Sequence, residues 1–98
     1  AGYQVLTAGD GEDALRVSEG FKGEIHLLLT DVVMPRMGGQ ELAERIRTLR
    51  PGIRVLYMSG FPDRELSHLA ALEPDANFLQ KPFSPQSLCL KVRETLGT

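Results

Sequence analysis

Three side chains with different chemistry stand at or just after the ends of short apolar segments. Asp31 ends the run Leu27-Leu28-Leu29-Thr30, Ser59 ends Val55-Leu56-Tyr57-Met58, and Lys81 follows Asn77-Phe78-Leu79-Gln80. Short apolar runs bounded by turn residues predict buried strands of a parallel sheet. The carboxyl ends of such strands meet at one edge, where open α/β sheets bind ligands. We therefore expect a carboxylate, a hydroxyl and an ammonium group to lie together.

This combination predicts a site that accepts a phosphoryl group. A carboxylate attacks phosphorus only if the charge on the phosphoryl oxygens is offset by a cation and donors already in place. Each residue also has an ordinary alternative: Asp31 and Ser59 are common turn residues, and Lys81 alone would be a solvated surface charge. The prediction therefore depends on the three side chains occurring together.

The elements that position these groups alternate between strand and helix patterns. We expect strands over residues 4–7, 27–31, 53–59 and 77–80, and helices over 12–19, 41–50, from 62–65 to 74–75, and 84–96. In the last helix Ser84 is the expected N-cap, Pro85 the first helical residue, and Leu88, Val92 and Leu96 the apolar stripe. Short connections between alternating strands and helices predict an α/β fold, with helices on both faces of a parallel sheet.

The order and spacing of Asp31, Ser59 and the Lys81-Pro82 pair resemble the receiver domain of two-component signalling, which takes a phosphoryl group from a histidine kinase onto an aspartate. The resemblance covers all 98 residues as one domain and implies a flavodoxin-like fold. It makes Asp31 the phosphoacceptor and assigns Ser59 and Lys81 to stabilising the phosphoryl oxygens. It implies a cis Lys81–Pro82 bond. Phe78 corresponds to an aromatic that moves inward during switching, although an ordinary core aromatic is an equal alternative.

The resemblance begins at the family's second strand, so we expect the chain to lack the receiver's first strand, acidic pair and first helix. Mg²⁺ is the expected metal of the complete domain, because it bridges carboxylate and phosphate oxygens. The resemblance implies the Asp31 carboxylate and the Val33 carbonyl as ligands, while its other acidic ligands are missing here. Asp10 and Asp13 better suit the N-terminus of a helix. We therefore expect weak Mg²⁺ binding.

The missing elements also affect the sheet. Strands 4–7 and 27–31 would each lose a partner, so we expect them either to pair directly or to form a dimer through the open sheet. The helix over 84–96 would cover one face alone and leave Val, Leu and Ile side chains exposed. These losses predict marginal stability.

Composition excludes several classes of partner. Eleven Lys and Arg against thirteen Asp and Glu give a formal charge of −2, which disfavours direct nucleic-acid binding. No apolar run approaches the roughly 20 residues of a membrane span, and no leader opens the chain, so we expect a cytoplasmic domain without membrane contact. Cys89, beside the stripe of the last helix, is expected to be a half-buried small hydrophobe.

Two enzymatic alternatives fit the residues less well. Gly9-Asp10-Gly11-Glu12-Asp13-Ala14 matches the dinucleotide-binding pattern G-x-G-x-x-A, but its acids would repel a pyrophosphate, and it leaves Ser59 and Lys81 unexplained. An aspartate-nucleophile phosphohydrolase would need a second acid two residues after Asp31, where Val33 stands. We therefore expect a phosphoacceptor rather than an enzyme.

The setting of the domain leaves further alternatives. A receiver fold retained as a protein-binding module without phosphorylation is possible, because the acidic pair is missing. The last third of the chain is most similar to receivers at the C-terminus of hybrid sensor histidine kinases, and a stand-alone response regulator is the second choice. The expected partner is a histidine kinase or its phosphotransfer domain.

Overall fold

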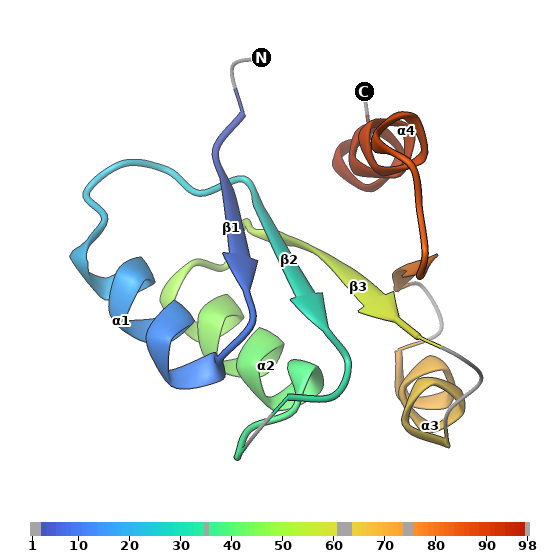
Figure 1. Ribbon diagram of the computed structural model, residues 1–98. Helices are drawn as coiled ribbons and strands as arrows, with labels where there is room; N and C mark the ends of the chain where they lie inside the picture. Colours follow the sequence, from blue (N-terminus) through green and yellow to red (C-terminus); the bar gives the residue numbers. More distant parts are fainter. Residues whose placement is uncertain (1–2, 35, 61–63, 74–75, 98) are drawn as a thin grey trace.

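The computed structural model describes residues 3–34, 36–60, 64–73 and 76–97 (Figure 1). The elements are β1 (Val5–Ala8), α1 (Gly11–Gly20), β2 (Leu27–Asp31), α2 (Gly39–Leu49), β3 (Arg54–Ser59), α3 (Arg64–Leu72), β4 (Asn77–Gln80) and α4 (Pro85–Leu96). Every predicted strand and helix is present, with small shifts at several ends. The signals expected to begin and end α3, at 62–63 and 74–75, and Pro35 lie outside the described residues.

All four strands run parallel in the order β1-β2-β3-β4. β1 pairs directly with β2, with Val5 opposite Leu27 and Ala8 opposite Thr30. Two contacts between Gln4 and His26 fix the start of this pairing: the His26 amide donates to the Gln4 carbonyl at 2.9 Å, and the Gln4 amide donates to His26 Nδ1 at 3.0 Å. The predicted direct pairing of the first strand with the second is confirmed.

Helices cover both faces of the sheet, as predicted. One buried cluster joins the sheet to α1, α2 and α3 through side chains that include Leu28, Leu42, Ile46, Tyr57 and Leu69. The second cluster joins the opposite face to α4 and contains Leu27, Leu29, Leu56, Met58 and Leu79. Figure 1 shows α1 and α2 together on one side of the strands and α4 on the other.

The face under α4 is only partly covered. A groove of about 720 Å³ runs between α4 and the first two strands, lined by Tyr3, Val5, Thr7, Leu29, Leu88, Cys89, Val92, Arg93 and Leu96. Leu27 and Leu29 are nevertheless buried, so the prediction of exposed side chains is wrong for these two leucines. The apolar residues of the expected α4 stripe are half-buried over them.

Two expectations about side-chain burial need correction. Cys89 is exposed rather than half-buried, because it follows Leu88 on the helix and is turned about 100° away from the stripe that faces the sheet. In the helix predicted over 41–50, the spacing of Leu42, Ile46 and Leu49 places all three on one expected buried face. Leu49 is nevertheless half exposed, since the last turn of α2 extends beyond the buried cluster.

The helix ends follow from local chemistry. Asp10 caps α1 by accepting hydrogen bonds from the amides of Glu12 and Asp13, and Ser84 caps α4 by accepting one from the Ser87 amide. Gly97 ends α4 with φ 81°, a conformation that glycine adopts freely. Within the described part of the chain, no helix combines the length and apolar character needed to cross a membrane.

Candidate functional site

The register of the sheet brings Asp31, Ser59 and Lys81 to one edge. Asp31 lies opposite Met58, and Ser59 lies opposite Gln80, the residue before Lys81. The Lys81 amide continues the pairing by donating to the Ser59 carbonyl at 2.7 Å. A hollow of about 270 Å³ opens at this edge, lined by Asp31, Val32, Val33, Met58, Ser59, Gly60 and Lys81.

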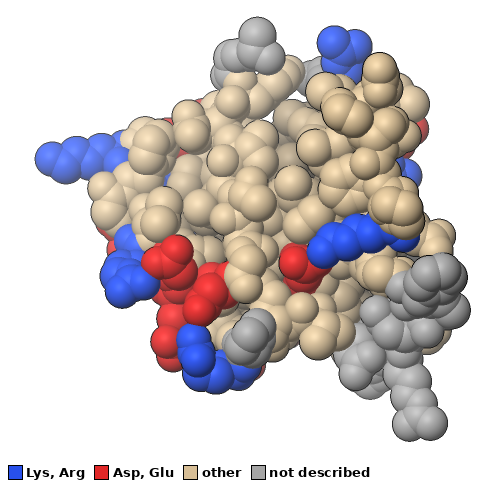
Figure 2. All heavy atoms as spheres, viewed as in Figure 1, with Lys and Arg blue, Asp and Glu red and all other residues tan. Residues whose placement is uncertain are grey.

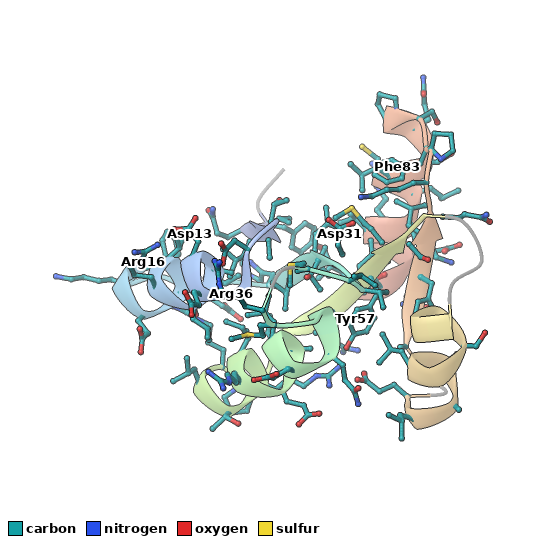
Figure 3. All side chains as sticks on the ribbon, turned by 60° about the horizontal axis from the view of Figure 1, so that its bottom comes forward. Asp13, Arg16, Asp31, Arg36, Tyr57 and Phe83 are labelled. Carbon is teal, nitrogen blue, oxygen red and sulfur yellow. The ribbon has the colours of Figure 1, made fainter. Side chains whose placement is uncertain are left out.

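Asp31 and Lys81 form an ion pair across the hollow, between Oδ1 of the carboxylate and the Nζ ammonium. Their side chains are 28% and 44% exposed, so both groups remain accessible to a ligand from solvent. The peptide bond between Lys81 and Pro82 is cis. Figure 3 shows Asp31 at the end of β2. Figure 2 shows acidic and basic atoms interspersed on this side of the molecule, without a broad field of one sign.

Ser59 lies at the floor of the same edge and is only 3% exposed. Its hydroxyl donates a long hydrogen bond, 3.4 Å, to the carbonyl of Gly60. Among the described residues, a Cβ atom on Gly60 would meet nothing within 4 Å, so there is room for a side chain at the position after Ser59.

The loop after Asp31 returns closely to the end of β2. The Gly39 amide donates to the Val32 carbonyl at 2.8 Å. A Cβ atom on Gly39 would lie 2.3 Å from the Asp31 carbonyl oxygen, so only glycine fits where α2 begins. Val33 projects outward and is 58% exposed, at the rim of the hollow.

The donor set does not suit Mg²⁺ as a resident ion. Asp31 is the only acidic side chain lining the hollow in the described chain, and its carboxylate is already paired with Lys81. Asp10 is used as the cap of α1 and pairs with Arg36, while Asp13 pairs with Arg16 at 2.5 Å. Among the described residues there is no group of three side chains that could hold a metal. Asp31 and the Val33 carbonyl alone are a poor site.

Phe78 packs on a partly buried hydrogen-bonding network that the sequence did not predict. Its ring stacks on Tyr57 with centroids 5.6 Å apart. The Tyr57 hydroxyl donates to Glu73 Oε2 at 3.0 Å, and Arg47 donates to Glu73 Oε1 at 2.9 Å. Burial, and then the adjacent Glu73 carboxylate, raise the pKa of Tyr57 well above its ordinary value. These partners are 16 and 26 residues apart in the sequence, and no local pattern links them.

Comparison with known proteins identifies the family. The model of the response regulator receiver domain matches residues 1–93. The chain belongs to the receiver domain family. It is 35% identical over 95 residues to the sensor kinase CckA of Brucella abortus and 35% identical over 97 residues to the response regulator receiver protein CpdR of the same species.

Structural comparison supports the same assignment. A response regulator receiver domain protein from Clostridium thermocellum superposes with a TM-score of 0.76 at 27% identity, over 98% of this chain and 76% of that one. The flavodoxin-like receiver fold is thereby confirmed. The match to CckA covers 97% of this chain but only 10% of CckA, and the match to CpdR covers 98% of this chain and 78% of CpdR. The chain spans only 40% of YbdJ and 39% of PhoP, two transcriptional regulatory proteins of Bacillus subtilis.

Proposed function

We propose that this receiver domain accepts a phosphoryl group on Asp31 from a histidine kinase or its phosphotransfer domain. The observation that carries the proposal is the Asp31–Lys81 ion pair at the sheet edge, in a hollow that Ser59 also lines. A carboxylate, a cation and a hydroxyl in one accessible hollow suit phosphoryl transfer to a carboxylate oxygen.

Each residue has a role in this chemistry. An Asp31 carboxylate oxygen attacks phosphorus as the bond to the donor breaks, and the donor leaves with the electron pair of that bond. The Lys81 ammonium offsets the charge on the phosphoryl oxygens, and the Ser59 hydroxyl donates to one of them after transfer. That new hydrogen bond would draw Ser59 toward the phosphoryl group and allow Phe78 to move inward. Mg²⁺ binding by this chain alone should be weak.

Labelling with phosphoramidate, followed by intact mass, tests the proposal. Asp31→Asn should abolish the added phosphoryl group, whereas Asp13→Asn, which changes an exposed acid of α1, should not. The label should be stable in acid and lost in base, as an acyl phosphate is. The 98-residue chain should label slowly. A fusion that places a receiver's first strand, acidic pair and first helix ahead of Ala1 should label faster. Equal labelling of Asp31→Asn would refute the assignment.

A second candidate function is a protein-binding module that is not phosphorylated. The poor set of metal donors among the described residues favours it. The fusion described above separates the two functions, because a phosphoacceptor should label faster when an acidic pair is supplied for the metal. A binding module would remain unlabelled on Asp31.

The setting of the domain is also a proposal. Its similarity to the sensor kinase CckA supports a place in a hybrid histidine kinase, and its similarity to CpdR supports a single-domain regulator. We favour the hybrid kinase, in the cytoplasm, with the kinase or phosphotransfer domain as partner and with no contact of this domain to nucleic acid. Association of two copies through the open sheet is a separate proposal, which sedimentation tests below.

A further inference from the structure

The loop between β2 and α2 is fastened to the first turn of α1 by an ion pair. Arg36 Nη2 lies 2.9 Å from Asp10 Oδ2, and its Nε lies 3.9 Å from Glu12 Oε2. Figure 3 shows Arg36 beside α1. The two ends of the pair are 26 residues apart, so the contact ties together segments that no short-range interaction would bring together.

The backbone at Arg36 is held in an unfavourable conformation. Its φ is 65°, in the left-handed region that a residue with a Cβ atom rarely occupies. Such a conformation persists only where surrounding contacts fix it. The ion pair with Asp10 is one such contact, because in this conformation the guanidinium group reaches α1.

A second contact joins the same loop to the start of α1. Met37 is buried and packs against Gly11, where an added Cβ atom would lie 2.7 Å from the Met37 sulfur. Two residues later, the Gly39 amide returns to the Val32 carbonyl. The loop is therefore held between α1 and the end of β2, and its first residues, Val32 and Val33, line the hollow beside Asp31.

We propose that the Arg36–Asp10 ion pair is a latch that positions the phosphoacceptor loop. Both are positioning residues: they hold Val32 and Val33 in place beside the Asp31 carboxylate and touch neither the carboxylate nor Lys81. The role in phosphorylation rests on the proposed function. Whether the ion pair holds the loop in place is a separate question, and it can be measured without a phosphodonor.

Asp10 permits a clean test because its two oxygens have different partners. Oδ1 accepts the amides that cap α1, and Oδ2 pairs with Arg36. Asp10→Asn therefore keeps the cap and removes the ion pair. Arg36→Gly removes the pair from the other side and also relieves the backbone, since glycine adopts a positive φ freely. Glu41→Gln is the matched control, because it breaks the exposed Arg45–Glu41 pair, also 2.9 Å long, on α2.

Two measurements on the 98-residue chain test whether the ion pair holds the loop. The first is hydrogen exchange of the Gly39 amide, which donates the hydrogen bond that joins the end of the loop to Val32. Both latch variants should speed this exchange about 1.5- to 5-fold, as expected for an exposed ion pair. The second is the initial rate of Asp31 labelling by phosphoramidate, which should fall by a similar factor. Arg36→Gly should show both effects without a loss of global stability, and Glu41→Gln should show neither.

The outcomes separate the latch from the proposed function. Unchanged Gly39 exchange in both variants would overturn the latch. Faster exchange with an unchanged labelling rate would overturn the positioning role, because a loosened loop would then not matter to Asp31. If labelling of the parent chain proves independent of Asp31, the proposed function fails. The exchange measurement then still decides whether the latch holds the loop.

Discussion

At the scale of single residues, the backbone of Gly39 lies too close to the main chain of Asp31 to admit a side chain. A Cβ atom on Gly39 would overlap the Asp31 carbonyl oxygen, which cannot move without displacing the end of β2. Gly39→Ala should therefore destabilise the domain by about 1–3 kcal/mol and slow the labelling of Asp31. Chemical unfolding of this variant measures the first effect.

The control for this prediction is Gly52→Ala. A Cβ atom on Gly52 would meet nothing within 4 Å, so the same substitution there should cost little. Equal unfolding free energies for the two variants would show that the close contact at Gly39 does not constrain the fold.

Tyr57 provides a second prediction at this scale. Its buried hydroxyl donates to Glu73, so Tyr57→Phe should lower the free energy of unfolding by about 1–2 kcal/mol at neutral pH. Because the pKa of Tyr57 is raised in the folded state, its proton leaves more readily from the unfolded chain. Above a pH of about 10 the wild-type protein should therefore lose stability that the variant does not.

Urea unfolding of both proteins at neutral pH and near pH 11 tests whether wild-type stability falls at high pH. The fall is expected because the tyrosine pKa in the unfolded chain is about 10. The difference between wild type and Tyr57→Phe should narrow at the higher pH, since titration of all other groups is common to both. A difference that widens would mean that Tyr57 is not held in its protonated form by burial and Glu73.

At the scale of elements, the sequence predicts most of the structure because its signals are local. Strand ends at Asp31, Ser59 and Gln80 agree with the structure, as do the cap at Ser84 and the start of α4 at Pro85. α1 begins at Gly11, one residue before the expected start, because Asp10 caps the helix there. Since parallel strands share one edge, the strand ends also predict that the three candidate site residues meet.

The contacts that local signals cannot predict are those between distant side chains. Arg50, the last residue of the helix predicted over 41–50, is the C-cap of α2, and its guanidinium group also caps the end of α1. It donates to the Ser18 hydroxyl and to the carbonyls of Ser18, Phe21 and Gly23 at 2.7–3.0 Å. Such pairings depend on how α1 and α2 pack, which the periodicity of either helix alone does not determine.

Arg50 leads to a prediction for α1. A lysine retains the charge but cannot make the several directed hydrogen bonds of a guanidinium group. Arg50→Lys should therefore destabilise the domain by about 1–3 kcal/mol and speed hydrogen exchange in the last turn of α1. Arg45→Lys, which alters an exposed arginine with a single ion-pair partner in α2, is the control. Equal effects of the two variants would contradict the capping role of Arg50.

At the scale of the whole molecule, the features that bear on stability are the position of β1 and the groove under α4. Among the described residues, β1 pairs only with β2 and forms one edge of the sheet. The half-buried side chains along the groove contribute less than fully buried ones would. The free energy of unfolding should therefore be limited by β1 and by the face of the sheet under α4.

A thermal melt compared with that of the fusion described above tests this prediction. Added elements that pair with β1 and fill the groove should raise the melting temperature by at least about 5 °C, the shift expected for roughly 1 kcal/mol in a domain of this size. Sedimentation of the unfused chain reports whether two copies associate through the open sheet. Equal melting temperatures for a monomeric chain and the fusion would contradict the predicted weakness.

The most direct test of the central claim is to locate the modified residue. Phosphoramidate-treated chain is reduced with borohydride, which converts an acyl phosphate to an alcohol, and is then mapped by peptide mass. We predict conversion at Asp31 alone, reduced in Lys81→Gln and absent in Asp31→Asn. Conversion at Asp10 or Asp13 with Asp31 unmodified would contradict the proposal that the Asp31–Lys81 pair forms the phosphoacceptor site.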